Sequence, residues 1–478
     1  MPITSELPEK GTFDEMMRDD GTCRPSYQRY CEWLNGVSEE TVKERMKGTD
    51  LLFHRVGITF NVYGNSEGTE RLIPFDPLPR IITSSEWEKI SRGLAQRAKA
   101  LNLFLDDIYH DGKIIKQGII PGRTVYGNSL YSPIMAGLTL PGGVYAHIIG
   151  TDLVRNSDGN YYVLEDNMRT PSGVSYMLQN RLIMMRLYPE LFLTQNVRPV
   201  DLYPRMLLDT LKKSSKVEDP TVVVLTPGHY NAAFYEHAYL AQQMGVELVE
   251  GSDLFVKDSH VFMKTTAGPK QVDVIYRRID DDFLDPLAFN PISVLGVPGL
   301  MAVYRKGNVI IANACGTGVA DDKSIYPYVP EMIRYYLSEE PILNNVSTSM
   351  CRRKADLLYV LKNISDMVVK EVHGAGGYGM LVGPKSTKKQ IEDFTEKLKA
   401  NPANYIAQPT LSLSTCPIFD GDKISPRHID LRPFILSSPD GCQIVPGGLT
   451  RVALKKGSLV VNSSQGGGTK DTWIVEEN

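Results

Sequence analysis

The sequence has little cysteine and no long apolar run. Its 478 residues include six cysteines, none of them in a CxxC pair, so neither a zinc site nor a disulfide framework is predicted and we expect reduced, mostly buried thiols. No segment approaches the roughly 20 apolar residues that a membrane-spanning helix needs. The first 20 residues are acidic and polar, whereas a signal peptide has a basic flank and an apolar stretch. We therefore expect a cytoplasmic protein without a membrane partner.

An excess of charge of one sign is also missing. The formal net charge is −4 and both signs are spread along the chain, which argues against a nucleic-acid partner. With 42% hydrophobic and 23% charged residues the composition is that of a soluble globular protein. The length predicts roughly two to four domains.

Several catalytic motifs are absent as well. The chain has no G-x-x-x-x-G-K-[ST] phosphate loop, no H-E-x-x-H zinc motif and no G-x-S-x-G nucleophile motif. P-loop nucleotidases, zincin metalloproteases and α/β-hydrolases therefore have no support in the sequence. No internal repeat is visible.

The most informative segment that is present is a predicted hairpin at residues 152–167. Asp158-Gly159 favours a two-residue type I′ turn, which pairs Asp152 with Glu165 and points Asn167 to the same face. Two facing carboxylates repel each other by roughly 0.2–1 kcal/mol, unless a cation lies between them. Two carboxylates and an amide form an all-oxygen set that suits Mg²⁺. The alternative is a solvent-facing hairpin with scattered acids.

A glycine-rich segment follows a predicted strand at residues 367–371. In HGAGGYG, Gly374, Gly376 and Gly379 match G-x-G-x-x-G, but a second short strand follows where a dinucleotide fold has a helix. This order predicts a flap that folds over phosphates, with Lys370 supplying positive charge. A plain β-turn beside an exposed lysine is the alternative, and a dinucleotide-dependent oxidoreductase is a weaker one.

Two further strands carry candidate nucleotide residues. Residues 405–408 form a short apolar strand that ends at Gln408-Pro409, a hinge whose backbone is placed to hydrogen-bond an adenine edge. His428, Asp430 and Arg432 alternate with apolar residues, which gives a strand one polar face. The functional interpretation is an arginine for phosphates and a histidine near the nucleotide, both oriented by Asp430. A polar stripe on an exposed strand is the alternative.

The coarse pattern indicates an α/β fold in four parts. Residues 1–115 are mainly helical, with an apolar stripe after a Ser85-x-x-Glu88 capping box. Residues 116–200 carry the hairpin. Residues 201–300 contain a βαβ unit typical of a Rossmann-like half-domain, in which Arg277 and Arg278 either bind a substrate carboxylate or form salt bridges with the following aspartates. Residues 301–478 alternate glycine-rich turns with strands, with one helix near residues 328–337.

Five segments together resemble the circularly permuted ATP-grasp proteins (type 2) related to glutathionylspermidine synthase. They are GTDLVRNSDGNYYVLEDNMRTPSGVSYMLQNR (150–181), ANACGTGVADDKSIYPYVP (312–330), VVKEVHGAGGYGMLVGP (368–384), PRHIDLRPFIL (426–436) and NSSQGGGTKDTW (462–473). In an ordinary ATP-grasp enzyme the nucleotide lysine and glycine loop precede the acidic metal motif. Here the acidic motif comes first, as circular permutation implies.

The resemblance implies a circularly permuted ATP-grasp fold with an inserted Rossmann-like pre-ATP-grasp domain and a helical N-terminal region. It also implies an ATP- and Mg²⁺-dependent carboxylate–amine ligase that forms ADP through an acyl phosphate, with a small-molecule or peptide carboxylate and an amine as substrates. The residues that match, together with the candidates above, are Asp152, Glu165 and Asn167 for the metal, Lys323, Lys370, Gly376, Gly377, Gln408 and His428 for the nucleotide, and Arg451 and Arg432 for catalysis.

One position departs from the family pattern. An arginine precedes the metal aspartate by two positions in the synthases, and here that position is Gly150. Substrate handling is therefore expected to differ. The alternative function is a catalytically inactive nucleotide-binding scaffold of the same fold, although the intact set of candidate ligands argues against it.

Overall fold

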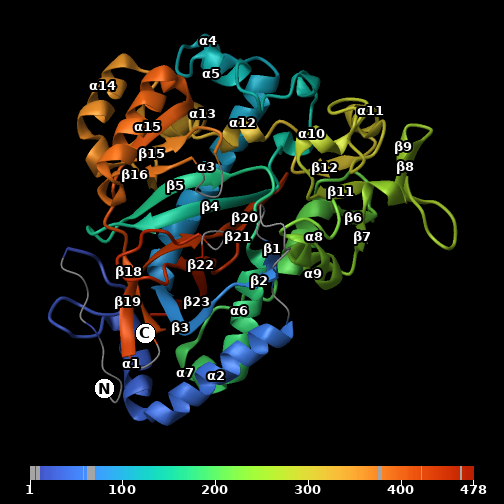
Figure 1. Ribbon diagram of the computed structural model, residues 1–478. Helices are drawn as coiled ribbons and strands as arrows, with labels where there is room; N and C mark the ends of the chain where they lie inside the picture. Colours follow the sequence, from blue (N-terminus) through green and yellow to red (C-terminus); the bar gives the residue numbers. More distant parts are fainter. Residues whose placement is uncertain are drawn as a thin grey trace.

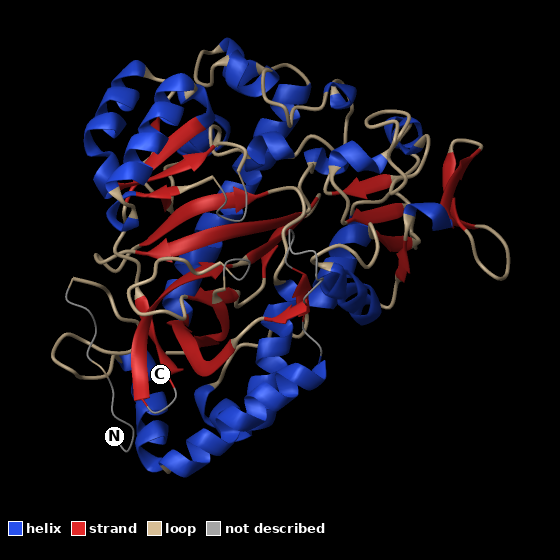
Figure 2. Cartoon of the chain, in the orientation of Figure 1, coloured by secondary structure: helices blue, strands red, loops and turns tan. Residues whose placement is uncertain are grey.

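The computed structural model describes residue 6 and residues 11–56, 59–61, 70–374, 379–420, 423–462 and 466–477. Its centre is a mixed sheet in which the strands follow the order β13-β5-β4-β19-β22-β23-β3, with β18 paired to β19 and β20 paired to β4 and β21. Smaller sheets lie on two sides of this central sheet, as the arrangement of strands in Figures 1 and 2 shows. The strands of the central sheet are β3 (Phe75–Thr83), β4 (Ile148–Arg155), β5 (Tyr161–Asn167), β13 (Asn344–Asn345), β18 (Thr415–Asp420), β19 (Lys423–Arg432), β20 (Phe434–Ser438), β21 (Gly441–Ile444), β22 (Leu449–Val452) and β23 (Gly468–Val475).

Two long helices cover opposite faces of the central sheet. Ile435 of β20 packs in the cluster formed with α3 (Ser84–Tyr109), whereas its neighbour Leu436 packs in the cluster formed with α6 (Val174–Leu187). This is the alternation that a strand requires. Leu153 and Val163 also belong to the α3 cluster, so the side chains of Asp152 and Glu165 point to the other face of the β4–β5 hairpin.

The N-terminal region is less uniformly helical than predicted. It contains α1 (Gln28–Gly36) and α2 (Glu39–Val56), but β3 joins the central sheet by parallel pairing with β23. The capping box lies two residues before the predicted position, because Thr83 is the N-cap of α3 and Glu86 is its partner. Ser85 lies inside the helix and is exposed. The apolar stripe of α3 packs in the core, as its spacing predicted.

A second sheet carries the glycine-rich segment. Its strands follow the order β14 (Ser349–Met350), β17 (Tyr405–Pro409), β15 (Met367–Glu371) and β16 (Leu381–Val382), and β15 and β16 are antiparallel. The predicted order of strand, glycine loop and strand is therefore present. Two helices that the sequence patterns did not indicate, α14 (Lys354–Asn363) and α15 (Lys388–Ala400), pack with this sheet around a small apolar cluster.

A third sheet contains the predicted βαβ unit. Its four strands are parallel and follow the order β12 (Ile310–Ala312), β11 (Val274–Arg277), β6 (Val222–Leu225) and β7 (Glu247–Val249). The helix between β6 and β7 is α9 (Phe234–Met244), which ends at Gly245 in the left-handed conformation that favours glycine. A small antiparallel sheet of β8 (Leu254–Lys257), β9 (His260–Met263) and β10 (Lys270–Val272) projects from its edge (Figure 1).

The remaining elements are short or lie at the periphery. They are β1 (Thr59–Asn61), β2 (Glu70–Leu72), α4 (Lys113–Lys116), α5 (Gly122–Tyr126), α7 (Pro189–Gln195), α8 (Tyr203–Lys213), α10 (Asp281–Leu284), α11 (Leu300–Arg305), α12 (Gly318–Asp321) and α13 (Val329–Leu337). Among the described residues, no helix combines the length and the apolar character needed to cross a bilayer.

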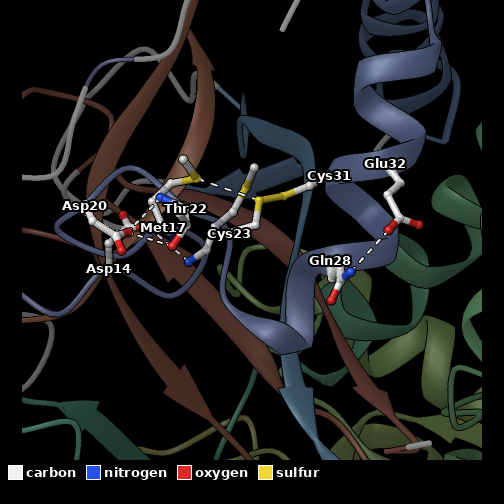
Figure 3. The surroundings of a disulfide bond; sticks show 9 residues. Asp14, Met17, Asp20, Thr22, Cys23, Gln28, Cys31 and Glu32 are labelled. Atoms are coloured by element: carbon white, nitrogen blue, oxygen red, sulfur yellow. Dashed lines mark hydrogen bonds between the residues drawn. A yellow bond between two sulfur atoms is a disulfide. The ribbon is translucent and has the colours of Figure 1, made fainter.

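The expectation that all six cysteines are reduced is wrong for one pair. Cys23 and Cys31 form a disulfide that joins the N-terminal segment to α1 (Figure 3). The two cysteines are eight residues apart in the sequence, and this spacing matches none of the patterns that indicate a bonded pair. The short 3-10 helix Pro25–Tyr27 lies between them. The other four cysteines are free, and three of these are buried.

Candidate functional site

A cavity of about 170 Å³ lies between the β4–β5 hairpin and the sheet of β15, β16 and β17. Its apolar lining comes from both sheets and from a segment after β22, and includes Val154, Leu164, Val346, Val368, Met380, Val382, Leu411, Leu413 and Leu459 to Val461. Its charged lining consists of Asp152, Glu165, Glu371, Asp430, Lys323, Lys370, Lys385 and Arg451. Apolar walls beside a group of convergent charges are typical of a site for a small molecule or cofactor.

The β4–β5 hairpin places two of the carboxylates opposite each other. Its turn is a three-residue loop and not the predicted type I′ turn, because Asn156 N donates to Asn160 O and only Gly159 has a positive φ, of 78°. A β-bulge at Leu164 then shifts the register back by one residue. Asp152 consequently pairs with Glu165 as predicted, and Asn167 pairs with Gly150.

Asp152 is buried and contacts two arginines. Arg432 donates from Nε to Asp152 Oδ1 at 2.5 Å and from Nη2 to Oδ2 at 2.8 Å. Arg451 donates from Nη2 to Asp152 Oδ2 at 2.8 Å. Burial alone raises the pKa of Asp152, but the two guanidinium groups outweigh it and hold that pKa well below its usual range. Asp152 is therefore a permanent anion at neutral pH.

Asp430 completes this cluster from the neighbouring strand. Arg451 donates from Nε to Asp430 Oδ1 at 2.9 Å, and its Nη2 contacts Asp430 Oδ2. β19 and β22 hold the pair in register, since Asp430 lies opposite Arg451. Two buried carboxylates and two arginines thus neutralise each other, which is the condition under which buried charges are tolerated.

Gly150 leaves the space that the Arg432 side chain occupies. A Cβ at position 150 would lie 3.4 Å from Arg432 Cδ and 3.0 Å from Pro171 Cβ. Arg432 therefore extends across β4 beside Gly150. Its guanidinium also donates weakly to Ser172 O at 3.4 Å.

Lys323 connects the β4–β5 hairpin to the glycine-rich loop. Its Nζ lies 3.1 Å from Glu165 Oε2 and donates to Gly374 O at 2.8 Å. Burial lowers the pKa of this lysine, but Glu165 outweighs burial and keeps the pKa above its ordinary value. Glu165 is the more accessible of the two hairpin carboxylates, with 26% of its side chain exposed.

Lys370 lies beside Gln408 on the adjacent strand. Its Nζ donates to Gln408 Oε1 at 2.8 Å, and Gln408 Nε2 donates to Thr348 Oγ1 at 3.0 Å. Burial lowers the pKa of Lys370 from 10.5 to about 8, because no carboxylate neutralises it directly. A largely buried cation that pairs with no carboxylate among the described residues is ready to bind an anionic ligand.

The residues of the hairpin fit a divalent cation in their chemistry. Glu165 offers a partly exposed carboxylate, and the Asn167 amide nitrogen donates to Gly150 O at 3.0 Å, which leaves the amide oxygen as a possible ligand. The three arginine hydrogen bonds leave Asp152 Oδ1 with one further lone-pair direction. Within the described residues no group of three His, Cys, Asp or Glu side chains is arranged to hold a metal, so a cation site here depends on the amide.

Several predicted residues lie elsewhere. His428 is buried behind the cavity wall, where its Nδ1 lies 2.8 Å from Leu413 O. Gly376 and Gly377 fall outside the described residues. Arg277 and Arg278 are buried and bind carbonyl oxygens together with Asp281 and Glu236, respectively. The interpretation that these two arginines bind a substrate carboxylate is therefore wrong.

The cavity also has a wall that the sequence patterns did not indicate. Leu459 to Asn462, in the segment between β22 and β23, line it, and Lys385 contacts both the cavity and the Gly457 carbonyl oxygen. The apolar run 459–461 is too short to stand out in a sequence. Only its position directly before the NSSQGGGTKDTW motif indicates in the sequence that this run lies near the site.

Comparison with known proteins places these features in a family. Residues 79–453 match the family model described as circularly permuted ATP-grasp type 2. The chain is 52% identical to an uncharacterised protein of Synechocystis over 97% of both chains, and 49% identical to one of Mycobacterium leprae over 97% of this chain and 82% of that one. It is 38% identical to a putative glutamate–cysteine ligase of Frankia alni, covering 99% of this chain and 55% of that protein.

A solved structure supports the fold independently. A glutathione synthetase-like effector from Globodera pallida superposes with a TM-score of 0.56 at 10% sequence identity, covering 92% of this chain and 98% of that one. At this level of identity the likeness concerns the fold alone.

Proposed function

The chain belongs to the circularly permuted ATP-grasp type 2 family, and we propose that it is an ATP- and Mg²⁺-dependent ligase that joins a carboxylate to an amine and releases ADP. One observation supports the proposal above all others. The two hairpin carboxylates, two lysines and an arginine, which come from four separate parts of the chain, line one cavity with apolar walls. Phosphoryl transfer depends on this kind of positioning and charge neutralisation.

The residues at the cavity that match the family pattern have distinct roles in the proposed reaction. The apolar walls and the β17 hinge at Gln408 hold the adenine, and Lys323 and Lys370 bind the phosphates. Asp152, Glu165 and Asn167 hold Mg²⁺, which neutralises phosphate charge when it is bound. Arg451, fixed by Asp430 and Asp152, stabilises charge on the transferring γ-phosphoryl group.

The proposed reaction has two steps, phosphorylation of the acid and attack of the amine. A carboxylate oxygen of the acid substrate attacks the γ-phosphorus, the bond to the β–γ bridging oxygen breaks, and an acyl phosphate and ADP form. The amine nitrogen then attacks the acyl carbon, phosphate leaves, and the nitrogen loses a proton to give the amide. Arg432 keeps Asp152 and Arg451 in place from the side facing Ser172.

The first assay uses the acid and amine that a relative's name suggests. Because the Frankia relative is named a putative glutamate–cysteine ligase, glutamate with cysteine is the first combination, followed by pools of amino acids, peptides and polyamines. We expect ADP release that requires Mg²⁺, an acid and an amine together. ADP at background with every pool, despite ATP binding, would remove the ligase assignment.

Glu165→Gln tests the metal assignment within the same assay. The substitution keeps the side-chain shape and removes one charge, so we expect turnover to fall by about 10²-fold or more while the thermal midpoint changes little. Glu247→Gln, on an exposed edge of the parallel sheet, is the matched control and should leave turnover unchanged. Unchanged turnover in Glu165→Gln would contradict the metal role.

A nucleotide-binding scaffold without catalysis is the second candidate function. It is favoured by the arginine contacts of Asp152, whose oxygens already accept three hydrogen bonds from Arg432 and Arg451. Calorimetry separates the two functions, since a ligase requires Mg²⁺ to strengthen ATP binding at this site. Equal ATP affinity with and without Mg²⁺ would favour the scaffold.

A further inference from the structure

Two consecutive residues at the start of the glycine-rich loop contact two consecutive residues after α12. His373 Nδ1 lies 2.6 Å from Asp322 Oδ2, and Lys323 Nζ donates to Gly374 O at 2.8 Å. The backbone supports the same contact, because Lys323 N donates to Val372 O at 3.1 Å. The sheet that carries the loop is thereby tied to the body of the protein beside a lysine of the cavity.

Asp322 is the fixed side of this contact. Its side chain is fully buried and accepts hydrogen bonds from Asn128 Nδ2 at 2.9 Å and from Ser324 N at 2.6 Å. Burial raises the pKa of Asp322, but its hydrogen bonds to His373 and Ser324 outweigh burial and lower that pKa. Asp322 therefore stays ionised and anchored, whereas His373, with 43% of its side chain exposed, is free to leave.

Three charged groups determine the protonation of His373. The hydrogen bond and charge of Asp322 raise its pKa, and they outweigh burial and the positive charges of Arg169 and Lys323, which lower it. Arg169 is itself paired with Asp321 at 2.6 Å, which weakens its effect. The contact is thus an ion pair below the raised pKa of His373, and above it a hydrogen bond between a neutral imidazole and the Asp322 carboxylate.

We propose that His373 and Asp322 form a latch that holds the start of the glycine-rich loop against Lys323, so that nucleotide binds more tightly when the latch is closed. His373 is a positioning residue in this account, because it acts through Gly374 and Lys323. The proposal rests on the assignment of the cavity to a nucleotide. Both residues lie in segments that carry the family resemblance, but neither belongs to the candidate ligand set.

The sign of the pH dependence follows from the ion pair. A histidine whose pKa is raised by its partner stabilises the contact fully at low pH, and that stabilisation is lost as pH rises through the raised pKa. We expect the affinity for a non-hydrolysable ATP analogue with Mg²⁺ to fall by about threefold to tenfold between pH 6 and pH 8.5, as the ion pair becomes a weaker hydrogen bond. The titrations of the ligand and of Lys370, whose pKa is about 8, are common to all variants and cancel in their comparison.

Calorimetric titration of three variants tests the latch. His373→Gln should bind weakly at both pH values, and His373→Lys, which keeps its charge, should bind tightly at both. His110→Gln is the matched control, because His110 also lies near an aspartate, Asp106 at 3.4 Å, at the end of α3 and outside the cavity lining. It should keep the pH dependence of the parent protein. The same pH dependence in His373→Gln would overturn the latch.

Hydrogen exchange provides a readout that needs no nucleotide. After correction for intrinsic rates, the peptide amides at Lys323 and Gly374 should lose protection between pH 6 and pH 8.5 in the parent protein, and His373→Gln should lack that protection at both. Unchanged protection would overturn the latch even if nucleotide binds. If no nucleotide binds at any pH, the proposed function fails, and the exchange result alone then supports or overturns the latch.

Discussion

Asp152 determines, at the scale of single residues, how the charged groups of the cavity are arranged. Its two arginine partners lie 280 and 299 positions further along the chain. Local patterns predict which face of a strand a side chain takes, but they carry no information about contacts over such separations. The sequence predicted Asp152 as a metal ligand, which stays a prediction, and gave no sign that Asp152 anchors Arg432 and Arg451.

Gly150→Ala tests the arrangement of Arg432. The added Cβ would lie 3.0 Å from Pro171 Cβ and 3.4 Å from Arg432 Cδ, so Pro171 must give way by a few tenths of an ångström beside Ser172, whose carbonyl oxygen binds Arg432. We expect turnover to fall, but by less than the roughly 10²-fold that a displacement of about 1 Å causes in a catalytic site, with the fold retained by circular dichroism. Gly36→Ala is the matched control, because nothing lies within 4 Å of a Cβ there. Equal turnover in both variants would contradict a catalytic role for Arg432.

Lys370→Met tests the cost of a buried cation. The pKa of Lys370 is about 8 in the folded protein and 10.5 ordinarily, so the unfolded chain binds more protons between these values and stability rises with pH there. Below about pH 8 the folded protein bears the full cost of the charge. We expect Lys370→Met to raise the thermal midpoint by a few degrees at pH 7, with the gain shrinking toward pH 10, and to abolish nucleotide binding.

The control for this substitution is Lys389→Met on the exposed face of α15. It should change neither the midpoint nor its pH dependence. A lower midpoint for Lys370→Met at pH 7 would mean that its hydrogen bond to Gln408 outweighs the cost of burying the charge.

At the scale of elements, the β4–β5 hairpin shows what a periodic pattern can and cannot predict. The alternation of the strands correctly placed Asp152 opposite Glu165. The turn itself was predicted wrongly, since the loop has three residues and Asp158 binds Asn160 N and the Tyr162 hydroxyl through its side chain. The bulge at Leu164 offset that error. Bulges depend on packing across the sheet, and the local sequence does not encode them.

The start of α3 provides a test at the same scale. Thr83 caps the helix and Glu86 closes the capping box, while Glu86 also binds Arg155 at the end of β4 at 2.6 Å. We expect Thr83→Ala to lower the free energy of unfolding by about 1 kcal/mol, measured by urea denaturation. Ser85→Ala, at the cap that the sequence pattern indicated, should cost only a few tenths of that. A larger loss of stability in Ser85→Ala than in Thr83→Ala would show that Ser85, and not Thr83, caps the helix.

At the scale of the whole molecule, the motifs were sufficient to predict the family and the α/β fold. Segments 150–181, 312–330 and 368–384 meet at one cavity, which their order in the chain alone does not show. The sequence did not reveal the helices α14 and α15 or the disulfide. Charged residues interrupt the short apolar stripes of α14 and α15. The disulfide depends on how the chain folds between Cys23 and Cys31, which the spacing of the two cysteines does not show.

The central claim is that the cavity activates a carboxylate as an acyl phosphate, and hydroxylamine trapping measures this most directly. Hydroxylamine replaces the unknown amine and converts an acyl phosphate into a stable hydroxamate. With ATP, Mg²⁺ and a pool of amino acids and peptides, we predict hydroxamate and ADP in equal amounts, both abolished by Glu165→Gln. Binding of ATP with Mg²⁺ but no hydroxamate from any acid, or release of AMP and pyrophosphate in place of ADP, would contradict the account.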